Sequence, residues 1–172
     1  LEPLPKGWKC KTDARTSKDL PGAVTAKLFD DQQLRTYRVA VATTGEYAQY
    51  HGGTVTDALA AINATMTRVN EVFERDLAIR LTLISETTRV IYTDPNTDPF
   101  GGNLSSEVQN ALDTEVGPAA YDIGHLFHQA GENGNAGFIG SVCEDSRKGS
   151  AFASTPTPEG DRFDLDFVAH EM

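Results

Sequence analysis

The chain has 172 residues, 39% of them hydrophobic, and its 25 acidic and 15 basic side chains give a net charge of −10. This length can bury the core of one globular domain and is too short to divide comfortably into two. The negative charge would repel phosphate backbones and anionic membranes, so nucleic acid is not expected as a partner. No run approaches the roughly 20 apolar residues that span a bilayer, so membrane insertion is not expected either.

Residues 1–34 are predicted to form an N-terminal arm or propeptide remnant ahead of a domain over residues 35–172. The arm carries three prolines and two glycines among scattered charges and shows no sustained hydrophobic period. The first residue is Leu1, and no apolar signal segment follows it. We therefore expect the chain to be a processed or excised piece of a longer protein.

The first half of the domain is predicted to be a strand, a long helix and a second strand. Residues 36–43 form a nearly continuous β-rich apolar run, typical of a strand covered on both faces. Thr54 and Asp57 resemble a capping box, and apolar residues follow at helical spacing as far as Phe73. Residues 78–84 form the next strand, and parallel pairing across such a crossover is the default.

The second half begins with less regular segments. Residues 89–92 are interpreted as an extension of the second strand past a bulge, and residues 94–99 as a loop. A second helix is predicted over residues 104–112, stopped by Gly117. Residues 121–127 are expected to form a third strand.

The last part of the chain combines a turn-rich stretch, a short strand and a helix. Residues 131–140 contain four glycines and are predicted to be turns, whereas the small residues 149–154 suit a strand at a sheet edge. A helix is expected to begin near Asp161 or Asp164. Three of its side chains are expected to share one face: Phe163, Phe167 and His170.

The final residues His170-Glu171-Met172 match the start of the motif His-Glu-x-x-His. In that motif two histidines four residues apart lie on one helix face and bind Zn²⁺, and the glutamate acts on water. A single His-Glu pair is a weak signal, because four histidines and many glutamates produce such pairs by chance. The other histidines offer no such spacing: His125 and His128 lie on or after a strand, and His51 lies in a loop.

Three segments, residues 136–143, residues 149–153 and a helix ending at 169–172, together resemble the reprolysin (adamalysin) branch of the metzincin zinc proteases. The predicted order of elements over residues 35–172 is also similar to that of the family. The resemblance implies an α/β fold with a twisted, mostly parallel sheet, an antiparallel edge strand and flanking helices.

For function, the resemblance implies a zinc-dependent endopeptidase acting on a protein or peptide substrate. His170 resembles the first Zn²⁺ ligand, and Glu171 resembles the general base that takes a proton from water. Ala151, Phe152 and Ala153 resemble the edge strand that binds an extended substrate through main-chain hydrogen bonds.

The sequence also departs from the family pattern. It contains neither the second and third histidines of the motif nor the methionine turn, and a catalytic zinc normally has three protein ligands. We therefore assign the protease function to the parent protein and expect the chain as given to bind zinc poorly and to be inactive. The alternative is a secreted, non-catalytic domain that engages a protein through its edge strand or acidic loops.

Asp94, Asn96 and Asp98 present alternating oxygen atoms that could hold Ca²⁺. An EF-hand is excluded, because Pro99 occupies its glycine position and Ser105 its bidentate acid position. A proline-stiffened turn with capping side chains is the competing interpretation.

Cys10 and Cys143 are the two cysteines of the chain. They are expected to form a disulfide, with two free thiols as one alternative. The family resemblance adds another, in which Cys10 belongs to a propeptide and occupies the zinc. Low cysteine content together with many Thr, Asn and Gly residues favours a secreted protein.

Overall fold

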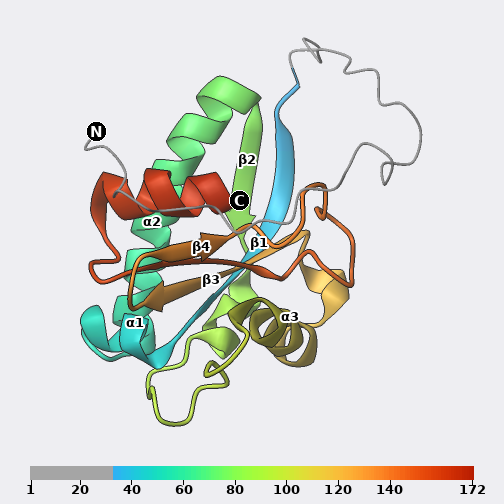
Figure 1. The fold of residues 1–172 in the computed structure, drawn as a ribbon. Helices are drawn as coiled ribbons and strands as arrows, with labels where there is room; N and C mark the ends of the chain where they lie inside the picture. Colours follow the sequence, from blue (N-terminus) through green and yellow to red (C-terminus); the bar gives the residue numbers. More distant parts are fainter. Residues whose placement is uncertain (1–32) are drawn as a thin grey trace.

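The computed structural model describes residues 33–172, in which a five-stranded sheet is flanked by helices on both faces (Figure 1). The strands are β1 (Arg35–Thr43), β2 (Ile79–Leu83), β3 (Ile123–Gln129), β4 (Asn133–Asn135) and β5 (Ala151–Thr155). The helices are α1 (Gly45–Tyr50), α2 (Val55–Leu77) and α3 (Leu104–Glu115), with three further helical segments, η1 (Ser85–Val90), η2 (Pro118–Ala120) and η3 (Arg162–Ala169). Among these helices none is long and apolar enough to cross a membrane.

The sheet has the order β2-β1-β3-β5-β4, and all of its pairings are parallel except that of β4 with β5. The predicted α/β fold, mostly parallel with an antiparallel edge strand, is therefore confirmed. Both faces of the central strands are covered, which explains the continuous apolar run of β1. Val39 and Val41 face the side of α1, α2 and η3, whereas Ala40 and Ala42 face α3.

Side-chain caps define the starts of the main helices. The hydroxyl of Thr54 accepts a hydrogen bond from the backbone N–H of Asp57 at 3.1 Å, as predicted for the start of α2. The side chain of Asn103 accepts one from Ser106 and begins α3. The predicted strand–helix–strand order of the first half is confirmed, because β1, α2 and β2 occupy those residues.

The predicted strand extension over residues 89–92 is wrong. The chain after β2 forms the 3₁₀-helix η1, and Ile91 makes only an isolated parallel bridge to Thr43. Thr87 and Val90 are both fully buried. Their three-residue separation matches one turn of a 3₁₀-helix, which brings both side chains to the same face.

The position predicted for the edge strand is also wrong. Ala151, Phe152 and Ala153 belong to β5, which lies inside the sheet between β3 and β4 and is paired on both sides. The edge is β4, in the glycine-rich stretch that was predicted to be turns. Gly134 and its asparagine neighbours have low β-propensity, so their pairing with β5 defines the strand.

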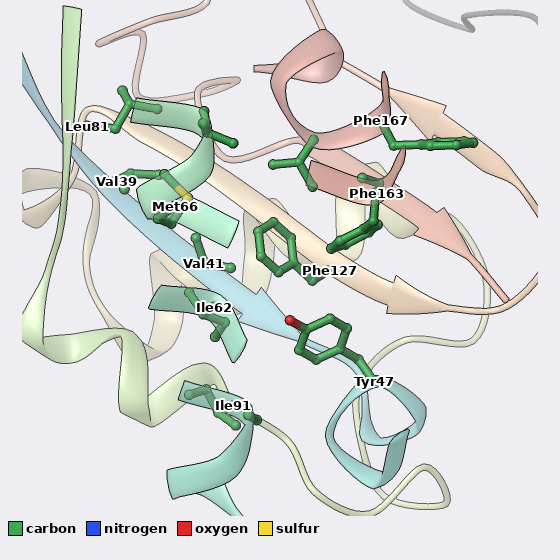
Figure 2. Close-up of a cluster of buried hydrophobic side chains, with 14 of the residues drawn as sticks. Val39, Val41, Tyr47, Ile62, Met66, Leu81, Ile91, Phe127, Phe163 and Phe167 are labelled. Atoms are coloured by element: carbon green, nitrogen blue, oxygen red, sulfur yellow. The ribbon is translucent and has the colours of Figure 1, made fainter. Parts of the chain in front are cut away.

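Aromatic side chains fill the core between the sheet and η3 (Figure 2). The rings of Phe127 on β3 and Phe163 on η3 meet edge to face with centroids 5.2 Å apart. Phe167 is fully buried in the same cluster. The packing of these rings holds η3 across the sheet, on the same side as α2 (Figures 1 and 2).

Gly124 of β3 provides a direct test of the packing between the sheet and α3. A Cβ atom there would lie 2.3 Å from Cδ1 of Leu112 and 2.7 Å from Cα of Gly149. We expect Gly124→Ala to lower the free energy of unfolding by about 1–3 kcal/mol through overpacking, measured by urea denaturation. Gly101→Ala is the matched control, because nothing lies within 4 Å of its added methyl group. Equal stability of the two variants would contradict this packing.

Candidate functional site

The helix that carries His170 and Glu171 has wider turns than an α-helix. Its residues Arg162–Ala169 form a π-helix, and its buried residues fall into two series spaced four apart, Phe163, Phe167 and Glu171 in one and Asp164 and Val168 in the other. The prediction that His170 shares the face of Phe163 and Phe167 is wrong, because His170 is exposed. The buried face is centred between these two series and includes Glu171, whereas His170 lies outside it.

Glu171 lies against the edge strand. Its side chain is 1% exposed and occupies the space where residue 134 would carry a side chain. A Cβ atom on Gly134 would lie 2.4 Å from Oε1 and 3.0 Å from Cγ of Glu171. Glycine in β4 is therefore explained by the close approach of this carboxylate.

A pocket of about 250 Å³ opens beside these two residues. Its wall on the helix side includes His170 and Glu171, and its floor includes Ala151 at the start of β5. Phe138 and Ile139 supply an apolar wall, and the side chain of Ile139 is 55% exposed. The pocket therefore has an imidazole and a carboxylate beside an apolar surface. Its volume is large enough for one amino-acid side chain.

A buried polar network holds the chain that forms this wall. The Nζ of Lys148 donates hydrogen bonds to the carbonyl of Pro118 and to Asp145, each at 2.5 Å. Gln109 of α3 accepts a hydrogen bond from the N–H of Gly149 at 2.7 Å and donates one to the carbonyl of Asp145 at 3.1 Å. Lys148 is only 6% exposed, so the loop is held to η2 through Pro118 and to α3 through Gln109.

Two polar contacts join the start of the site helix to α2. The hydroxyl of Thr65 donates to Oδ1 of Asp164 at 2.8 Å in a buried position. One turn further along α2, Arg68 makes two hydrogen bonds with Asp161, at 2.7 and 2.9 Å. Burial raises the pKa of Asp164, whereas the guanidinium of Arg68 lowers that of Asp161.

The remaining histidines have separate environments. His125 on β3 is fully buried, neither ring nitrogen has a hydrogen-bond partner among the described residues, and burial lowers its pKa to about 3. His128 contacts Oγ1 of Thr44 at 3.0 Å, and His51 contacts the carbonyl of Pro158 at 3.2 Å. Within residues 33–172 no three His, Cys, Asp or Glu side chains are grouped so that they could hold a metal ion.

The carboxylates of the predicted calcium loop cap backbone groups. Asp94 accepts a hydrogen bond from the N–H of Asn96 at 2.9 Å. Asp98 accepts from Gly45 at 2.6 Å, at the start of α1, and from Phe100 at 3.0 Å. These contacts support the interpretation as a capped turn, and calcium binding stays a prediction.

Cys143 is exposed at the surface. Its predicted partner Cys10 lies outside the described residues, as does nearly all of the predicted arm over residues 1–34. The disulfide and the alternative pairing of Cys10 with zinc therefore stay predictions.

Comparison with known protein families gives a match that covers most of the chain. A family model described as "Metallo-peptidase family M12B Reprolysin-like" matches residues 33–172. A search of curated proteins finds no match to the chain. The matched range includes the whole sheet, the pocket and the helix that ends with His170 and Glu171.

The raised pKa of Asp164 predicts a distinct pH dependence of stability. A carboxyl whose pKa is higher in the folded than in the unfolded protein stabilises the fold most at low pH, and this stabilisation is lost as pH rises through the folded pKa. We therefore expect the free energy of unfolding of Asp164→Asn to rise relative to that of the wild type as the pH increases from 4 to 7, as measured by urea denaturation. Asp161→Asn should show the opposite trend, because its pKa is lowered. Parallel trends for the two variants would contradict the assigned environments.

Proposed function

The chain belongs to the reprolysin-like M12B metallopeptidase family, and from this premise we propose that the full-length protein is a zinc-dependent endopeptidase with His170 and Glu171 in its reaction centre. One observation carries the proposal. The exposed imidazole of His170 and the buried carboxylate of Glu171 lie at one end of η3, beside an open sheet edge and a pocket.

His170 is suited to be a zinc ligand, because its imidazole is exposed at the rim of the pocket. Within residues 33–172 it is the one histidine at this site, and a catalytic zinc takes three protein ligands. The proposal therefore requires further ligands from outside residues 33–172, and residues 33–172 alone are expected to be inactive. Zinc held there would polarise the scissile carbonyl and acidify the attacking water.

Glu171 is proposed as the general base. Its carboxylate is held in one place by its burial against Gly134, so little reorientation is needed when it accepts a proton from the attacking water. The same carboxyl group would then pass a proton to the leaving amine. Its position next to β4 puts this proton transfer beside the edge where a peptide can lie.

The substrate peptide is proposed to pair with β4. Because β5 is paired on both sides, the role first expected for Ala151, Phe152 and Ala153 passes to β4 (Asn133–Asn135). The outer side of β4 has no strand partner among the described residues. Main-chain hydrogen bonds to such an edge bind an extended peptide with little demand on its side chains. The adjoining pocket would accept one apolar side chain of the substrate.

Substitution of Glu171 separates metal binding from proton transfer. In the full-length protein, we expect Glu171→Gln to keep about one zinc per chain and to lower kcat on a peptide substrate by roughly 10²–10⁴-fold, the usual contribution of a general base. His170→Ala should lose zinc, as measured by elemental analysis of the purified protein. Glu71→Gln, on the exposed face of α2, is the matched control and should change neither quantity.

Wild-type turnover by the Glu171→Gln variant would exclude Glu171 as the base. A wild-type full-length protein that contains no zinc and hydrolyses no peptide would favour the alternative, a secreted and non-catalytic binding domain.

A further inference from the structure

The sheet has two outer strands, β4 beside the proposed reaction centre and β2 at the opposite side (Figure 1). Each pairs with one strand among residues 33–172, β4 with β5 and β2 with β1. The main-chain groups on the outer side of such a strand can pair with a further extended chain. The proposed function gives this role to β4, so the contacts on the outer side of β2 decide whether the sheet offers a second binding edge.

The main-chain groups of Leu81 point to the outer side of β2. At the two ends of this strand, the carbonyl of Ala78 and the N–H of Ile84 are both hydrogen-bonded to β1. The residues that bond to one neighbouring strand alternate along the chain, so the even-numbered residues of β2 face β1 and the odd-numbered residues face away from it. Leu81 is the middle one of the three odd-numbered residues in β2.

Asn70 of α2 occupies this outer side. Its Nδ2 donates a hydrogen bond to the carbonyl of Leu81 at 2.8 Å, and its Oδ1 accepts one from the N–H of Leu81 at 2.7 Å. A side-chain amide carries the same donor and acceptor as a peptide group, so Asn70 makes the two contacts that one residue of an added strand would make. Both main-chain groups of Leu81 are therefore already paired within the protein.

Occupation of this one position interrupts the whole edge. Outward-facing residues recur every second residue along a strand, about 6.6 Å apart. With Leu81 paired to Asn70, the two remaining outward positions of β2 lie about 13 Å apart with an amide side chain between them. Arg80 of β2 also makes two hydrogen bonds with Glu74 of α2, at 2.7 and 2.9 Å. Charged side chains on an outer strand further oppose its pairing with another chain.

We propose that Asn70 closes the β2 edge to strand addition, so that β4 is the edge of this sheet at which an extended chain pairs. The inference rests on the proposed function for the identity of the chain at β4, a substrate peptide. The chain that an opened β2 edge would accept is a second copy of this protein, because two such edges related by a two-fold axis present the same row of groups to each other. Asn70 thus prevents the sheet from continuing into a neighbouring molecule.

Removal of the amide tests the closure of β2 in the full-length protein. We expect Asn70→Ala to strengthen self-association by about ten- to a hundredfold over the wild type, because a few main-chain hydrogen bonds become available between two copies. Sedimentation velocity at a series of protein concentrations measures this change. Asn63→Ala is the matched control and should associate no more than the wild type, because exposed Asn63 donates its hydrogen bond to Leu59 within the same helix.

A second variant separates an open edge from a loss of stability. Asn70→Asp loses the donor to the carbonyl of Leu81, as Asn70→Ala does, but it keeps an acceptor for the N–H and adds a negative charge at the edge. We expect lower thermal stability in both variants and stronger self-association in Asn70→Ala alone, because like charges on two facing edges repel. Equal self-association of the two variants would attribute the effect to instability and overturn the proposal.

Hydrogen exchange identifies the edge that pairs. The amide of Leu81 should exchange about tenfold faster in monomeric Asn70→Ala than in the wild type, and it should become protected again as the variant associates. Oxidised insulin B chain, used as an extended peptide probe on the Glu171→Gln variant, should protect amides of β4 and leave those of β2 unchanged. Protection of β2 by this peptide, or association of Asn70→Ala without protection of β2, would overturn the proposal.

The two proposals fail in different experiments. If the wild-type protein contains no zinc, cleaves no peptide and shows no protection of β4 by the B chain, the proposed function fails. The self-association of the Asn70 variants still decides whether Asn70 closes the β2 edge, because that measurement needs neither zinc nor substrate.

Discussion

The packing of η3 against the sheet is the constraint on which the rest of the site depends. Phe163 and Phe167 bury their rings beside Phe127, and each such side chain contributes about 1.5–3 kcal/mol relative to exposure. This packing brings Glu171 against Gly134 on the edge strand. The end of the helix that carries His170 and Glu171 therefore has a fixed position relative to the strand proposed to receive the substrate.

The other parts of the site come from distant stretches of the chain. The parallel sheet supplies the floor of the pocket through the start of β5, and the loop that includes Phe138 supplies its apolar wall. Gln109 holds this loop to α3, and a hydrogen bond from Lys148 to Pro118 holds it to η2.

The sequence predicted those elements whose patterns are local. The apolar run of β1, the cap and periodicity of α2 and the motif at His170 all lie within a few neighbouring residues. Long-range contacts decide the features that were missed. Gly134 forms a strand because it pairs with β5 and receives Glu171, and η3 is joined to α2 by a hydrogen bond between residues 99 positions apart.

Placing a methyl group on Gly134 tests most directly whether the contact of Glu171 with the edge strand organises the reaction centre. In the full-length protein, we expect Gly134→Ala to keep its zinc and to lose about 100-fold in kcat, because the carboxylate must move by an ångström or more. Gly131→Ala, whose added methyl group meets nothing within 4 Å, should retain wild-type kcat. A Gly134→Ala variant with wild-type kcat would contradict the account.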